Sequence, residues 1–88
     1  MTLKIQRHIK KDNARFNLCG QIDAKELPEL QRLLGAEEQK YVVLDLKEVK
    51  FVDREALKFL VHCQESGIKV TNCPAYIREW LSREATQK

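Results

Sequence analysis

The side chains that could carry out catalysis are few and scattered along this chain. Its two serines, Ser66 and Ser82, lie outside any Gly-x-Ser-x-Gly motif, the pattern that presents a nucleophile on a strand-to-helix turn. The two histidines, His8 and His62, fall on different predicted elements, and the three glycines form neither a Walker loop nor a dinucleotide fingerprint. We therefore expect no enzymatic activity, no cofactor and no metal site.

Cysteine is the residue type with the most reactive potential. Cys19, Cys63 and Cys73 are odd in number, far apart and without a Cys-x-x-Cys pair, which indicates neither a disulfide framework nor a zinc site and favours a reducing compartment. Cys73 precedes Pro74 at the predicted start of a helix, where amide dipoles can lower a thiol pKa. Two interpretations stay open: a thiol-based redox protein that uses Cys73, or a partly buried capping cysteine.

Length and charge restrict the class of protein further. A chain of 88 residues can bury one small core, so we expect a single domain over residues 1–88. No apolar run approaches the ~20 residues of a membrane-spanning helix, and residues 1–7 lack an apolar signal core, so we expect a cytoplasmic protein without membrane insertion. The basic excess lies in residues 1–15, which contain none of Phe, Tyr or Trp; we therefore expect a solvated strand edge and no nucleic-acid binding. The alternative that stays open is nucleic-acid binding through this basic hairpin, which would depend steeply on salt.

These residues must be positioned by a small set of elements, of which the first is a hairpin. Alternating apolar residues predict antiparallel strands over residues 3–9 and 16–22, joined by a four-residue loop over 11–14 that sets Ile9 opposite Phe16. This register collects the apolar side chains on one face.

Helical and strand patterns then alternate. An Asp23 capping box and helical spacing predict a helix from about Leu27 to Gly35. A buried strand follows over 41–46, then a polar turn at 47–48 and an extended segment over 49–52.

The rest of the chain repeats this alternation. We expect a helix after Asp53 that runs to Gln64, a short strand over 68–72, and a last helix that opens at Cys73 and Pro74. The order ββαβαβα predicts an α/β fold with one small mixed sheet and an N-terminal antiparallel hairpin.

Four short motifs occur in a recognisable order. They are Leu18-x-Gly20-x-Ile22-Asp23, Pro28-Glu29-Leu30, Val42-Val43-Leu44-Asp45-Leu46 and Phe51-Val52-Asp53. Their order and spacing over residues 1–84 resemble a STAS domain, the family that includes the bacterial anti-sigma factor antagonists.

The chain departs from that family in two places. Antagonists carry Asp-Ser-Ser-Gly at the start of the second helix and are phosphorylated on the second serine, whereas this chain has Asp53-Arg54-Glu55-Ala56. Glu55 then either mimics a phosphorylated state or simply stabilises the helix dipole from the first turn. The family pattern also continues for about one more strand and one more helix.

The resemblance implies a non-catalytic regulatory module that binds another protein. The family's usual contact surface corresponds to Asp53, Arg54, Glu55 and Leu57. By resemblance, the partner is a kinase-like anti-sigma factor, another stress-signalling component, or the ATPase of an ABC transporter that this chain serves as an accessory subunit.

The last predicted helix suggests a second surface. Its apolar side chains are Tyr76, Ile77, Trp80 and Leu81. Because the elements that normally follow are missing from the pattern, we expect these side chains to be partly uncovered, or to form a homodimer or partner surface.

Overall fold

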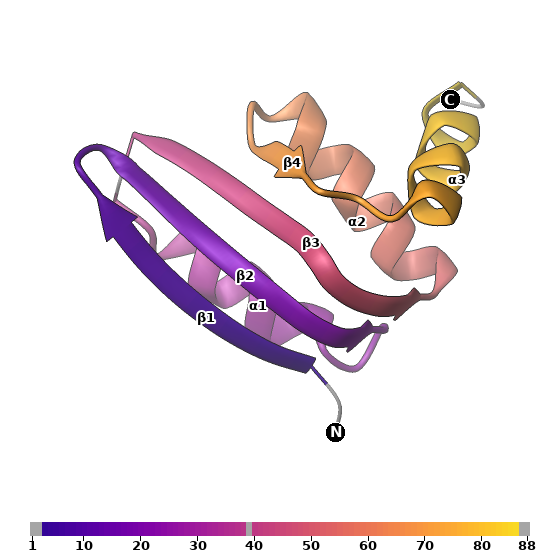
Figure 1. Cartoon of the computed structure of the whole chain (residues 1–88), viewed down its shortest axis with the longest axis horizontal. Helices are drawn as coiled ribbons and strands as arrows, with labels where there is room; N and C mark the ends of the chain where they lie inside the picture. Colours follow the sequence, from indigo (N-terminus) through magenta and orange to yellow (C-terminus); the bar gives the residue numbers. More distant parts are fainter. Residues whose placement is uncertain (1–2, 39, 87–88) are drawn as a thin grey trace.

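A computed structural model of the chain describes residues 3–38 and 40–86 and confirms the predicted α/β fold (Figure 1). The strands are β1 (Leu3–Lys10), β2 (Asn13–Ile22), β3 (Tyr41–Val52) and β4 (Lys69–Thr71), and the helices are α1 (Leu27–Gly35), α2 (Arg54–Glu65) and α3 (Ala75–Thr86). The sheet order is β1-β2-β3-β4, antiparallel between β1 and β2 and parallel elsewhere. The expected domain also includes positions 1–2, 39 and 87–88, which lie outside the described residues.

The hairpin of β1 and β2 has a register that differs by two residues from the predicted one. Ile9 lies opposite Ala14, not Phe16, and the loop contains only Lys11 and Asp12. Lys11 adopts a φ of 55°, a left-handed conformation that helps the chain to reverse over this short distance. Because a shift of two residues keeps every side chain on its own face, the predicted apolar face is retained.

The helices α1 and α2 lie behind the sheet in Figure 1 and cover its apolar face. The apolar sides of strands and helices form one core, whose largest fully buried side chains are Phe16, Leu18, Ile22, Leu30, Leu44, Leu46, Leu57, Leu60, Ile77 and Val52. In this view no helix lies in front of β1, β2 or the first half of β3. The front face of the sheet is therefore free of helices there.

Arg7 is a polar residue on the apolar face of β1. Its Nε and Nη2 donate to Oε1 and Oε2 of Glu37 at 2.5 and 3.0 Å, and the Glu37 side chain is almost completely buried. This bidentate ion pair connects β1 to the segment after α1, and its hydrogen bonds raise the pKa of Arg7. The pairing explains how a charged side chain is accommodated on this face.

β3 is one continuous strand, so the predicted turn at Lys47 and Glu48 is wrong. Its pairing with β2 is irregular at this point: Asn17 pairs with Asp45, but Cys19 pairs with Glu48, so β3 accommodates an extra residue. Lys47 and Glu48 are exposed at this irregularity. Their polarity therefore marks a bulge within the strand and not its end.

The first helix begins and ends where the sequence predicts, but its start differs in detail. Asp23 Oδ1 accepts from the backbone N–H groups of Lys25 and Glu26 at 3.1 and 3.2 Å, which closes a turn before the helix. The predicted hydrogen bond from the Glu26 N–H to Asp23 is thus present, but the N-cap residue is Glu26, which makes no side-chain cap hydrogen bond, so Asp23 does not cap the helix itself. Pro28 lies in the first turn, where it disrupts no helical hydrogen bond.

Candidate functional site

The loop between β3 and α2 is fixed by Asp53. Its Oδ1 accepts from the N–H of Ala56 at 2.8 Å and thereby caps α2, as the sequence predicts, and its Oδ2 accepts from the N–H of Ala24 at 3.0 Å. The Asp53 N–H donates to the carbonyl of Ile22 at 3.2 Å. One carboxylate thus joins the start of α2 to the turn that follows β2, which makes Asp53 a positioning residue for this surface.

Arg54 and Glu55 project from the first turn of α2 into solvent. Glu55 Oε2 lies 3.9 Å from Lys58 Nζ, and both side chains are more than half exposed, so this pair is weak. No acidic side chain among the described residues forms an ion pair with Arg54. The surface at the start of α2 therefore presents one unpaired cation beside one loosely paired anion.

Leu57 does not belong to this exposed surface. The side chain is fully buried in the core shared by the sheet and the helices. The expectation that Leu57 touches a partner is corrected accordingly, because position 57 lies on the inward face of α2, one turn after Asp53. Its role is to hold α2 against the sheet.

A groove between α1 and α2 extends the surface beyond the loop. It has a volume of about 270 Å³ and is lined by Leu27, Gln31, Glu55, Lys58, Phe59 and His62. Leu27 and Phe59 are half-buried and provide apolar area, whereas the remaining side chains form a polar rim. Sequence reasoning missed this groove because two helices separated by a strand form it. The sequence feature that could have indicated the groove is Phe59, an apolar residue beside the core-facing stripe of α2.

The structure divides the apolar side chains of α3 between two environments. Ile77 and Leu81 are buried, whereas Tyr76 and Trp80 are 50% and 37% exposed. The Tyr76 hydroxyl donates to the carbonyl of Lys50 in β3. The prediction that this helix is partly uncovered is therefore confirmed for its aromatic side chains only.

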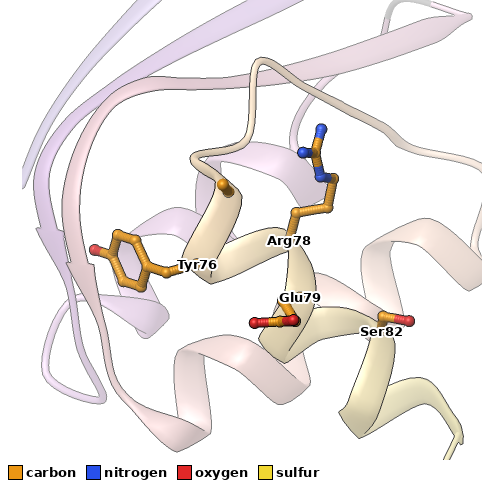
Figure 2. A pocket seen from close by; sticks show the side chains of 5 residues that line it. Tyr76, Arg78, Glu79 and Ser82 are labelled. Carbon is orange, nitrogen blue, oxygen red and sulfur yellow. The ribbon is translucent and has the colours of Figure 1, made fainter.

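The outer side of α3 is an open depression with a volume of about 670 Å³. Ala75, Tyr76, Arg78, Glu79 and Ser82 line it, and Figure 2 shows that Arg78 and Glu79 extend away from the helix. Both signs of charge are present and no buried polar group faces the space. The depression shows no chemistry specific to one class of ligand.

Cys73 lies one position further from α3 than the sequence suggests. The carbonyl of Pro74 accepts the first helical bond, from the Arg78 N–H at 2.9 Å, and α3 begins at Ala75. Burial raises the pKa of the Cys73 thiol, and the nearby Arg78 guanidinium opposes that shift only in part. Burial also raises the pKa of Cys63 to about 11. These shifts are opposite to what an activated thiol requires.

Asp45 organises a polar cluster on the helix-free face of the sheet. Its Oδ2 accepts from Arg15 Nη2 at 2.6 Å and Asn72 Nδ2 at 3.2 Å, and its Oδ1 accepts from the Lys47 N–H at 2.9 Å. Burial by itself would raise the pKa of Asp45, but these hydrogen bonds and the Arg15 charge lower it. The cluster ties β2, β3 and the end of β4 together.

The part of the chain that the structure describes contains neither a candidate metal cluster nor a candidate membrane span. Within residues 3–38 and 40–86, no group of three His, Cys, Asp or Glu side chains could hold a metal ion. No helix in this part of the chain is long and apolar enough to cross a membrane.

No protein-family model matches the chain, and the curated proteins contain no significant match to it.

Proposed function

We propose that this chain is a non-catalytic, cytoplasmic protein-interaction module of the STAS type, similar to an anti-sigma factor antagonist but without the phosphorylation switch. The observation that carries the proposal is the arrangement at the start of α2. Asp53, at the position where the family motif has its aspartate, is held by Ala24 and Ala56, so that Arg54 and Glu55 face solvent.

The groove between α1 and α2 supports a protein partner. It begins at Glu55 and continues past the half-buried rings and methyl groups of Phe59 and Leu27. Protein interfaces combine an apolar centre with a polar rim, and this groove has both. The partner surface that we propose therefore consists of Arg54, Glu55 and this groove.

The absence of a switch follows from the residue at the acceptor position. Glu55 carries a permanent negative charge where the antagonists of this family carry a serine, and Lys58 neutralises that charge only weakly. A partner that binds this surface encounters the same charge at all times. We infer constitutive binding that is regulated by the partner's abundance and not by phosphorylation at this site.

Resemblance implies three classes of partner, namely a kinase-like anti-sigma factor, another component of a stress-signalling assembly, and the ATPase of an ABC transporter. All three would be recognised through the same surface. Arg54 is the test residue because it is exposed and unpaired, so its replacement changes the surface and leaves the fold unaltered.

Affinity capture from lysate of the native cells tests this function. Tagged wild-type protein, the Arg54→Glu variant and the Lys4→Glu variant are compared by quantitative mass spectrometry. Lys4 is an exposed base in β1 that pairs with Cys19 and so lies on the helix-free face of the sheet, opposite to α2, and it serves as the matched control. We expect a specific partner that wild type and Lys4→Glu retain and that Arg54→Glu loses. Equal recovery by all three proteins would rule out this surface.

A further inference from the structure

The helix-free face of the sheet carries a basic patch that is not apparent from the order of residues in the chain. Strand pairing places Lys10, Asn13 and Tyr41 in one row across β1, β2 and β3. The next row on the same face consists of His8, Arg15, Val43 and Lys69. We define the basic sheet face by Lys10, Arg15, Tyr41 and Lys69, which are all exposed.

Tyr41 carries the largest aromatic ring in these two rows, which also contain the imidazole of His8. Tyr41 is 53% exposed, and its backbone N–H donates to the carbonyl of Asp12 at 3.1 Å, which fixes the start of β3 beside the hairpin loop. Lys40 Nζ lies 5.6 Å from the ring centroid. The topology therefore places an aromatic surface next to a basic segment that lies more than twenty-five residues away in sequence.

The charge of this end of the sheet is predominantly positive. Lys11 and Lys40 border the basic sheet face, and both are exposed. Of the acidic side chains at this end, Asp45 is already paired with Arg15 and Asn72. Two exposed acidic side chains remain at this end, Asp12 in the hairpin loop and Glu38 just before Lys40.

We propose that the basic sheet face binds single-stranded nucleic acid. The lysine side chains neutralise the phosphates, because the charge of Arg15 is already balanced by Asp45, and an exposed aromatic ring stacks on a base irrespective of its identity. A helix-free face accommodates an extended strand without displacement of a helix. Charge complementarity and the exposed ring together favour this ligand over an acidic protein, which would use the charges but not the ring.

In the folded chain an aromatic side chain does lie beside the basic hairpin, although the sequence-based argument against nucleic-acid binding assumed that none did. That argument depended on the lack of Phe, Tyr and Trp in residues 1–15. Parallel pairing of β2 with β3 supplies Tyr41 from another part of the chain, opposite Asn13. The site lies at the start of β3, whereas Arg54 follows its end, so the two surfaces are separate.

Fluorescence anisotropy with a labelled 12-nucleotide oligo(dT) measures the proposed binding. With about three or four phosphates neutralised, log K falls against log salt with a slope of about −2 to −3. Lys10→Ala should reduce the magnitude of that slope by about 0.7, whereas Lys58→Ala on α2 should leave it unchanged.

Stacking is tested by substitution of Tyr41 and by removal of the bases. Tyr41→Ala should weaken binding at least about fivefold, and Tyr41→Phe should bind like wild type. Tyr76→Ala is the matched control, because Tyr76 is similarly exposed on α3. An abasic oligodeoxynucleotide of the same length should bind at least about fivefold more weakly than oligo(dT).

Several results would overturn the proposal. No binding at 50 mM salt would do so directly. Equal affinity for oligo(dT), the abasic strand and heparin would reveal a general polyanion surface. Stronger binding to vesicles of anionic lipid than to oligo(dT) would assign the face to a membrane surface. If Tyr41→Ala and Tyr76→Ala changed the affinity for oligo(dT) equally, the Tyr41 ring would have no specific part in binding.

Discussion

Asp53 shows how one carboxylate can organise the surface that we propose as the partner site. Both of its oxygens accept backbone hydrogen bonds, from Ala56 within α2 and from Ala24 in the turn after β2. These two bonds fix the orientation of the carboxylate. The exposed neighbours Arg54 and Glu55 depend on it for their positions.

Replacement of Asp53 should cost stability through both contacts. Asp53→Ala removes the cap of α2 and the bond to Ala24, and we expect a loss of about 1–3 kcal/mol in the free energy of unfolding. Asp53→Asn retains an oxygen acceptor and should lose less than half as much. Urea denaturation followed by circular dichroism provides the measurement. A change below about 0.5 kcal/mol for Asp53→Ala would show that neither contact stabilises the fold.

Cys63 and Cys73 should react slowly. Burial raises the pKa of Cys73 and holds that of Cys63 at about 11, so both thiols are protonated near neutral pH. Alkylation at pH 7 with mass-spectrometric mapping should therefore show slower modification of these two positions than of free glutathione. Rapid modification of Cys73 alone would instead favour the thiol-based redox function.

At the scale of elements, α3 combines a structural side with an exposed side. Ile77 is fully buried, whereas Trp80 is 37% exposed and lies outside the core. Ile77→Ala should lower the free energy of unfolding by about 2–4 kcal/mol, and Trp80→Ala by less than about 1 kcal/mol. Urea denaturation of the two variants compares these losses.

The same pair of variants tests whether α3 mediates assembly. If Trp80 belongs to a dimer surface, Trp80→Ala reduces the sedimentation coefficient at high concentration while stability is retained. Wild type that sediments as a monomer throughout would exclude the homodimer. A large stability loss for Trp80→Ala would show that its ring packs in the core.

The elements also show which structural features the sequence pattern can predict. Alternation with period two identifies the apolar face of β1 and β2, but any even shift satisfies it, so the Ile9 register was missed. The short loop depends on Lys11 at positive φ, a conformation that a lysine in the sequence does not predict. In β3, Lys47 and Glu48 have the polarity of a turn, but a bulge allows them inside a strand.

The candidate site, like the fold, was predictable only where a local sequence preference decides the structure. Asp53 was correctly expected at the N-cap, because that preference is local and strong. The inward orientation of Leu57, the groove beside Phe59 and the position of Tyr41 beside the hairpin all depend on tertiary packing. Local patterns do not contain that information.

At the scale of the whole molecule, stability should depend on pH through Asp45. Hydrogen bonds hold its pKa below the ordinary 3.8, so its contribution to stability is fully present above that value and is lost as pH falls through the folded-state pKa. Wild type should therefore unfold progressively more easily below about pH 4. Glu29, whose pKa the Arg32 side chain lowers, adds to the same trend.

The Asp45→Asn variant isolates this effect. At pH 7 it should be less stable than wild type by about 1–3 kcal/mol, because the charged bond from Arg15 is lost. Between pH 4 and pH 2 its stability should vary less steeply than that of wild type, with the contribution of Glu29 remaining. Parallel pH profiles for the two proteins would show that Asp45 does not titrate in this range.

The molecule as a whole keeps its two proposed surfaces apart. The basic sheet face lies where β3 begins, and Arg54 lies two residues after Val52, where β3 ends. A protein partner at α2 and a nucleic-acid strand at the hairpin end can thus bind independently. Arg54→Glu should leave oligo(dT) binding unchanged, and Lys10→Glu should leave capture of the protein partner unchanged.

The most direct test of the protein-interaction function places a photo-crosslinking amino acid at position 54 and, as a control, at position 4, and irradiates the native cells. Both positions are exposed, but only position 54 adjoins the groove of α1 and α2. We predict one dominant crosslinked protein at position 54 that is absent at position 4 and is lost when Glu55 and Lys58 are both replaced by alanine. The same crosslinks at both positions, or none at position 54, would contradict the account.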